Sequence, residues 1–262
     1  MICFLPFSSR VIHRSFNNGQ LGRGYSALSV EQHTKCHETY VSSAFLIFAS
    51  ISSAGHYLLT LWKNLRSVSG GILSQVHHFD SKAKVEEYVR SEGIPATFLL
   101  PGFYMSNIPG GNLRKTPEGT WKLALPIPGD SPIPLFASEY DTGKFVKAIL
   151  LKRDETLGKR IYAATKYYTP LEILATFKDE YPNAGKLAVF SELPHAVFKG
   201  ILAAAGLPEV AQEELLENMR LMPEFGYYGG EALDSSVAVG LHLLKQNLSL
   251  VPRSVLTTSA DC

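Results

Sequence analysis

Hydrophobic and polar positions follow regular patterns only in the later part of the chain. From Gly71 onward, apolar residues recur at helical spacing in some stretches and form the short continuous runs of buried strands in others. The pattern predicts helices near 78–92, 141–153, 169–177, 197–205 and 209–222, and strands near 44–49, 57–62, 96–100 and 186–190. Because strands alternate with helices, the predicted class is α/β with a mainly parallel sheet.

Two of the predicted helices carry recognisable start signals. Thr169-Pro-Leu-Glu172 has the Thr and Glu of a capping box, with Pro at the first helical position. Asp141-Thr142 is predicted to cap a second helix. That helix ends near Lys152 and Arg153, whose positive charges suit the negative end of the helix dipole.

The beginning of the chain lacks any sustained pattern. Residues 1–30 contain no Asp or Glu but carry Arg10, Arg14 and Arg23, a composition that mitochondrial presequences share. We favour the alternative, a poorly ordered segment over residues 1–40, followed by one domain over 41–240 and a tail over 241–262. The uncharged stretch between Glu38 and Lys63 has the length of a membrane helix. Its serines instead favour two buried strands, so no membrane association is expected.

The amino-acid composition limits the classes of function that this chain is expected to have. Hydrophobic residues make up 45% of the chain, which is enough for a sizeable core. The formal net charge is only +1, so direct nucleic-acid binding is not expected. The 3 cysteines are far apart, which argues against a disulfide scaffold and fits a reducing compartment.

Two places in the patterned region have residues suited to ligand chemistry. His78 and Lys82 are four residues apart, on one face of a helix start, where an ammonium could bind ribose hydroxyls or phosphates of a dinucleotide. A capping His and a solvated Lys are the alternative. Pro101–Asn107 directly follows a strand, and ligands of open α/β sheets lie beyond the carboxyl ends of strands. An ordinary surface turn is the alternative there.

Two further patterns are weak. His33, Cys36 and His37 lie close together, but the adjacent pair cannot easily share one metal without another ligand, so no metal site is predicted. The glycine run Gly19-x-x-Gly22-x-Gly24 does not follow an apolar strand, as a phosphate-binding loop should.

Several runs in the same order resemble the NmrA-like family over roughly Leu58 to Val239. They are His77-His78-Phe79-Asp80-Ser81-Lys82-Ala83, Val85-Glu86-Glu87-Tyr88, Gly93-Ile94-Pro95-Ala96-Thr97, Pro101–Asn107, Asp141–Val146, Leu215–Met219 and Glu224–Gly230. This family is an atypical branch of the short-chain dehydrogenase/reductase fold. The resemblance implies a partial Rossmann-like parallel sheet with a smaller α/β C-terminal lobe.

The resemblance also implies a cofactor, NADP(H) or NAD(H), in the cleft between the lobes. Lys82 corresponds to the family's cofactor-contacting Lys, and the segment after the next strand lines the nicotinamide end. The implied cofactor-binding residues are therefore Lys82, Gly102, Phe103, Tyr104, Met105, Ser106 and Asn107. A regulatory protein partner such as a transcription factor, and a cytoplasmic or nuclear location, fit the same resemblance.

The candidate catalytic residues, His78 and Lys82, depart from the parent fold. Its dehydrogenases use Tyr-x-x-x-Lys, with the Tyr as general acid, whereas this chain has His78-x-x-x-Lys82. Family members that bind cofactor and regulate share this change. The leading interpretation is thus an NAD(P)-binding redox-sensing or regulatory protein with weak or no dehydrogenase activity.

Two alternatives remain open. One is an NAD(P)-dependent oxidoreductase that acts on a small-molecule carbonyl or alcohol. The other follows from the first strand and Gly-x-x-Gly-x-x-Gly loop of the family, neither of which is found in this sequence. Their absence would fit a truncated remnant or a wrong gene model that no longer binds cofactor.

Overall fold

The computed structural model describes residues 46–47 and 56–234. The predicted N-terminal segment 1–40 and the predicted tail 241–262 lie entirely outside these ranges. So do the Gly19 to Gly24 run and the His33, Cys36 and His37 group. Within the described residues the alternation of strands and helices confirms the predicted α/β class.

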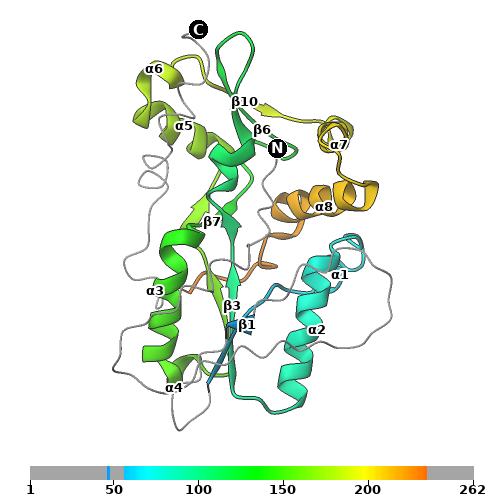
Figure 1. Ribbon diagram of the computed structural model, residues 1–262, viewed down its shortest axis with the longest axis vertical. Helices are drawn as coiled ribbons and strands as arrows, with labels where there is room; N and C mark the ends of the chain where they lie inside the picture. The colour runs from blue at the N-terminus through cyan, green and yellow to red at the C-terminus, as the bar shows by residue number, and fades with distance from the viewer. Residues whose placement is uncertain (1–45, 48–55, 235–262) are drawn as a thin grey trace, which may run out of the picture.

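The main sheet has the strand order β1-β2-β3-β8. β2 (Tyr57–Thr60), β3 (Ala96–Pro101) and β8 (Arg160–Ala163) run parallel to one another. Figure 1 shows α3 (Ser138–Leu151) on one side of these strands and α1 (Leu65–Val68) and α2 (His77–Ser91) on the other. This is the three-layer arrangement expected when helices connect parallel strands.

Successive residues of each strand belong to different cores. Phe98 of β3 packs in a cluster that contains Phe79 of α2, whereas the next residue, Leu99, packs in a cluster with Phe145 of α3. This is the period-2 alternation of a strand that is covered on both faces. It explains why these strands are mostly apolar and do not alternate regularly between apolar and polar residues.

Two smaller sheets and the remaining helices complete the described part. The sheets have the orders β4-β7-β9 and β10-β6-β5. Their strands are β4 (Phe103–Tyr104), β5 (Leu113–Lys115), β6 (Trp121–Leu125), β7 (Ile133–Phe136), β9 (Lys166–Tyr168) and β10 (Val189–Glu192). The helices are α4 (Arg153–Thr156), α5 (Pro170–Glu180), α6 (Pro182–Gly185), α7 (His195–Ala204), α8 (Glu209–Phe225) and the π-helix η1 (Ile108–Asn112).

The structure corrects the expected direction of the first strand. β1 (Leu46–Ile47) pairs antiparallel with β2, although both apolar runs were expected in a parallel sheet. Only residues 48–55 separate β1 from β2, and a parallel crossover needs a dozen or more residues. No helix in the described residues is long and apolar enough to cross a membrane.

Two element boundaries also differ from expectation. α3 begins at Ser138, so Asp141 lies in its first turn as a buried residue and does not cap it. The last strand begins at Val189 and not at Lys186, because Lys186 still has helical backbone after α6. The capping box of α5 is confirmed, since both of its reciprocal hydrogen bonds are present.

Candidate functional site

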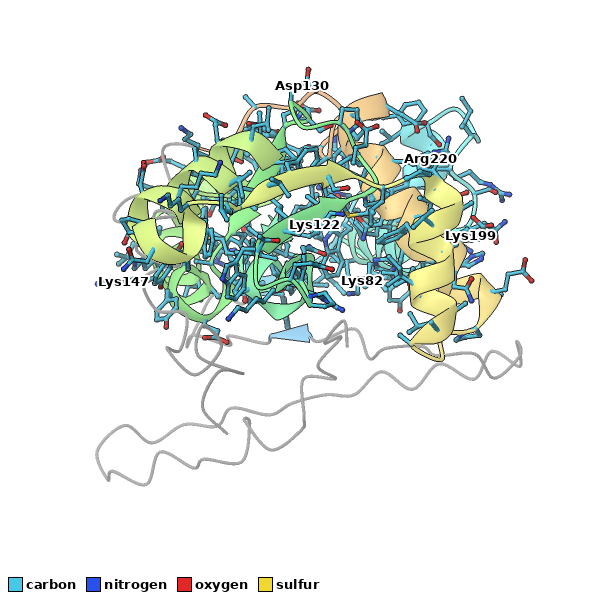
Figure 2. The ribbon with its side chains drawn as sticks, turned by 90° about the horizontal axis from the view of Figure 1, so that it is seen from above. Lys82, Lys122, Asp130, Lys147, Lys199 and Arg220 are labelled. Carbon is cyan, nitrogen blue, oxygen red and sulfur yellow. The ribbon has the colours of Figure 1, made fainter. Side chains whose placement is uncertain are left out.

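The candidate site lies where the parallel strands β2 and β3 end. Trp62 follows β2, Tyr104 follows β3, and Lys82 comes from the first half of α2, which connects the two strands. Carboxyl ends of parallel strands are where open α/β sheets bind ligands. Figure 2 looks down on the molecule from above and labels Lys82 together with Lys199 of α7 and Arg220 of α8.

Lys82 is held against an aromatic ring. Its Nζ lies 3.6 Å from the centre of the Trp62 ring, a cation–π contact. Within the described residues this ammonium has no carboxylate partner. Burial without a counter-charge lowers the pKa of Lys82 to about 8. The amine therefore keeps hydrogen-bonding capacity that a ligand can use.

His78 lies one turn before Lys82 and is fixed by α8. Its Nδ1 is 2.5 Å from Oε1 of Glu214, and its backbone N–H donates to the same oxygen over 2.8 Å. Burial works to raise the pKa of the Glu214 carboxyl, but the hydrogen bonds from His78 outweigh it and lower the pKa. The other ring nitrogen, Nε2, makes no hydrogen bond to any residue between 56 and 234.

Tyr227 connects the two predicted parts of the site. Its ring packs edge-on to Phe79 of α2 with centroids 6.2 Å apart, and the Trp62 ring packs against Phe79 as well, with centroids 5.5 Å apart. Burial raises the pKa of Tyr227, and the phenol of Tyr104 nearby raises it further. Tyr104 therefore lies near enough to Tyr227 to affect its pKa, but no hydrogen bond or ion pair in the described chain joins Lys82 to residues 102–107.

The seven predicted cofactor residues have different surroundings. Gly102 and Met105 are buried; a Cβ on Gly102 would lie 2.3 Å from the carbonyl oxygen of Pro134. Packing inside the protein therefore accounts for both residues without a ligand. Phe103 also packs partly against the core, whereas Ser106 is exposed.

Asn107 and Tyr104 keep partial access to solvent. Asn107 precedes η1, and its amide makes no hydrogen bond within the described ranges. Tyr104 is half-buried with its ring 6.2 Å from that of Phe136, and burial raises its pKa. Together with Lys82 they are the predicted residues best placed to meet a ligand.

A second lysine stands at the same strand ends. Nζ of Lys63 donates to the carbonyl oxygen of Tyr228 over 2.8 Å and pairs with Glu231 at 3.3 Å. The hydroxyl of Tyr228 lies 3.1 Å from the carbonyl oxygens of Leu100 and Ala163, where β3 and β8 end. Lys63 therefore secures the segment that follows α8, and its charge is already paired.

The residues present fit one end of a dinucleotide better than the other. An ammonium, an amide and flat aromatic faces suit a ribose and a nicotinamide ring. The described ranges contain no Gly-x-x-Gly-x-x-Gly run that could hold a pyrophosphate. No group of His, Cys, Asp or Glu among the described residues could hold a metal ion.

Four residues of the site were not predicted. Trp62 and Lys63 end an apolar run, so the rule that singled out Pro101–Asn107 would have found them. Glu214 and Tyr227 had no such signal. Glu214 resembles the other acids of an amphipathic helix, and its contact is 136 residues away in sequence.

Comparison with known proteins gives the family. The NmrA-like family model matches residues 38–251. A stretch of 104 residues, 37% of this chain, is 34% identical to the nitrogen metabolite repression protein nmr of Neurospora crassa, of which it covers 21%. A stretch of 102 residues, again 37% of the chain, is 30% identical to nmrA of Emericella nidulans and covers 29% of that protein. The alignments therefore span less than a third of either relative.

Solved structures share the fold at low sequence identity. The negative transcriptional regulator NmrA in complex with NADP superimposes with a TM-score of 0.62 at 19% identity, over 79% of this chain and 67% of that one. The NADPH-dependent quinone oxidoreductase QOR2 of Escherichia coli, complexed with NADPH, has a TM-score of 0.56 at 18% identity, over 74% and 64%. The fold, the motif order and the family model agree, and this chain belongs to the NmrA-like family.

Proposed function

We propose that this chain binds NADP(H) or NAD(H) and acts as a redox-sensing or regulatory protein with weak or no dehydrogenase activity. The observation that carries the proposal is Lys82, whose ammonium lies on Trp62 at the carboxyl ends of β2 and β3 without a carboxylate partner. Partly buried cations are costly unless they are paired, which favours a site that an anionic or hydroxyl-rich ligand completes.

Relatives support the dinucleotide as that ligand. NmrA, called a negative transcriptional regulator, has been solved with NAD and with NADP, and QOR2 with NADPH. In this chain Lys82, Trp62, Tyr104 and Asn107 are the residues that would meet the ribose and nicotinamide. When bound, the nicotinamide supplies or accepts a hydride, and the protein orients the ring and excludes water.

Weak catalysis is expected from the residue at position 78. Carbonyl reduction needs a proton for the developing alkoxide, and the parent fold takes it from a Tyr. His78 offers a shorter side chain, and Glu214 already engages its Nδ1. A missing general acid costs about 10²–10⁴-fold in rate, whereas the Lys82 contact to a ribose does not require the Tyr.

Calorimetric titration of the full chain with NADPH and NADH tests the binding. We expect saturable binding, weakened about tenfold or more by Lys82→Met, since a hydrogen bond to a charged group contributes roughly 1.5–3 kcal/mol. Lys84→Met is the matched control because Lys84 is exposed on the same helix. Absence of binding by the unmodified chain would favour the non-binding remnant over both other functions.

A reductase screen with a panel of carbonyl and quinone substrates separates regulation from catalysis. The oxidoreductase alternative predicts robust turnover by the unmodified chain, abolished by His78→Ala. Our proposal predicts poor turnover, with His78→Tyr at least as active as the unmodified protein. A transcription-factor partner and a cytoplasmic or nuclear location stay predictions, which affinity capture and microscopy can test.

A further inference from the structure

The helix that carries Lys82 has no cap of its own. Its N-cap residue is Val76, which offers no side-chain hydrogen bond. Asp80, the acid in its first turn, instead accepts from the backbone N–H of Leu65 over 3.1 Å. The first N–H groups of a helix have no partner inside the helix and need one from elsewhere.

A carboxylate from α8 supplies one of those partners. Glu214 accepts from the backbone N–H of His78 over 2.8 Å, and Glu217 accepts from the backbone N–H of Gln75, just before the helix, over 2.7 Å. Glu214 also holds the imidazole of His78 at 2.5 Å. Glu217 is 7% exposed and the side chain of Glu214 is 21% exposed, so both contacts are largely shielded from solvent. A residue of α8, a helix that is distant in sequence, thus caps α2, although residues next to the helix start usually have this role.

The capped turn leads directly into the ligand site. His78 and Lys82 are separated by one helical turn, and both side chains adjoin Trp62. The His78 and Trp62 rings meet edge-on with centroids 6.2 Å apart. Any movement of the first turn of α2 would therefore displace the ammonium and change the ring surface beneath it.

We propose that Glu214 is the positioning residue of the Lys82 site: by capping α2 from α8, it fixes where the ammonium and the Trp62 face meet a bound dinucleotide. This inference rests on the proposed function and deepens it. It makes α8 energetically coupled to dinucleotide binding, because a ligand at Lys82 and the α8 contact stabilise the same position of α2.

A double-mutant cycle in the full chain tests the coupling. We expect Glu214→Gln to weaken NADPH binding by about tenfold, within the usual range for coupled sites. Glu213→Gln is the matched control. It removes the same charge one residue away, where the carboxylate pairs with Lys199 of α7 and not with α2. We expect it to leave binding within about twofold of the unmodified protein.

Positioning can be told apart from a general structural role. If Glu214 acts through Lys82, then Glu214→Gln changes NADPH binding less than about twofold in a Lys82→Met background. A full effect in that background, or no effect of Glu214→Gln in the unmodified chain, would overturn the inference.

A ligand-free measurement keeps the inference separate from the proposed function. Acetic anhydride labelling read by mass spectrometry gives the rate at Lys82 relative to exposed Lys84. We expect Glu214→Gln to change this ratio by about threefold or more, since local opening of α2 frees the amine, and Glu213→Gln to leave it unchanged. If the unmodified chain binds neither NADPH nor NADH, the proposed function fails, and an unchanged labelling ratio would also reject the positioning role.

Discussion

At the end of β3, the backbone of β7 leaves no room for a side chain on Gly102. Gly102 was expected to be one of the cofactor-binding residues. In the structure it is the neighbouring strand that approaches, with the carbonyl of Pro134 at 2.3 Å from where a Cβ would be. Gly102 lies where β3 of the main sheet packs against β7 of a smaller sheet, and this packing explains the glycine without a ligand.

We therefore expect Gly102→Ala to destabilise the protein by about 1–3 kcal/mol, because the methyl group meets backbone that cannot easily move. Urea unfolding of the purified variants measures this. Gly143→Ala is the control: a Cβ on Gly143 in α3 meets nothing within 4 Å, and alanine should stabilise that helix by roughly 0.5–1 kcal/mol. Equal stability of Gly102→Ala and the unmodified protein would contradict the packing role.

A buried imidazole at the other end of β2 makes the protein sensitive to acid. His56 is 4% exposed and lies 2.7 Å from the hydroxyl of Thr97, which itself donates to the carbonyl of Thr156. Nε2 of His56 therefore carries a proton as donor, and Nδ1 has no hydrogen-bond partner among the residues that the structure describes. Burial lowers the pKa of His56, and the charge of Arg153 lowers it further.

Because the folded protein has the lower imidazole pKa, the unfolded chain takes up this proton first as pH falls. The free energy of unfolding should therefore decrease from about pH 6.5 downward. We expect His56→Asn, which keeps a donor for Thr97, to show a smaller decrease between about pH 8 and pH 5 in denaturant titrations. His195→Asn, at an exposed position, should follow the unmodified protein; an identical slope for His56→Asn would refute the assignment.

Among the elements, α5 shows how local sequence alone can set a boundary. Thr169 accepts from the backbone N–H of Glu172 over 3.1 Å, and the Glu172 side chain accepts from the backbone N–H of Thr169 over 2.8 Å. α2 shows the opposite case, since its first turn is capped from α8. The start of α5 could therefore be predicted from the local sequence, whereas the dependence of α2 on α8 could not.

Removing the local cap should destabilise the protein measurably. We expect Thr169→Ala to cost about 1 kcal/mol, the usual value for losing an N-cap side chain. Thr176→Ala on the same helix should be close to neutral, because its hydroxyl only bonds back to the carbonyl of Glu172 within the helix. Thermal unfolding followed by circular dichroism compares them, and equal melting temperatures for the two variants would go against the capping role.

At the scale of the whole molecule, one buried carboxylate ties α2 to the far strand of the main sheet. Glu86 is 2% exposed, and both of its oxygens accept from Nε of Arg160 in β8, at 2.9 and 3.0 Å. It also accepts from Nε of Arg90 over 2.8 Å, and the Arg90 guanidinium stacks on Phe98 of β3. The cluster joins α2 to two neighbouring strands of the main sheet.

We expect Glu86→Gln to lower the free energy of unfolding by about 1–3 kcal/mol, since hydrogen bonds to a charged group are lost at a buried position. Glu87→Gln removes the same charge from the adjacent, exposed position and should change stability by less than about 0.5 kcal/mol. Urea titrations at one ionic strength provide the comparison. A Glu86→Gln protein as stable as the Glu87→Gln protein would show that the cluster contributes nothing.

Much of the fold could be predicted from the sequence because the patterns that indicate it are local. Helix periodicity placed α7 and α8, the capping box fixed α5, and the apolar run of β3 was found within one residue. The strands β4, β5, β6, β7, β8 and β9 were missed, since runs of two to five residues carry too little pattern. The antiparallel direction of β1 was also missed because strand direction is a property of pairing.

The sequence by itself determined the α/β class, the main helices and the family, and it singled out His78 and Lys82 as candidates, because spacing and motif order are properties of the chain alone. Only the tertiary structure decided what those residues touch. It placed Trp62 beneath Lys82, brought Glu214 to His78 across 136 residues, and turned Gly102 inward against Pro134. Such contacts depend on how distant elements pack, and no local pattern encodes which of several exposed-looking acids will meet a given histidine.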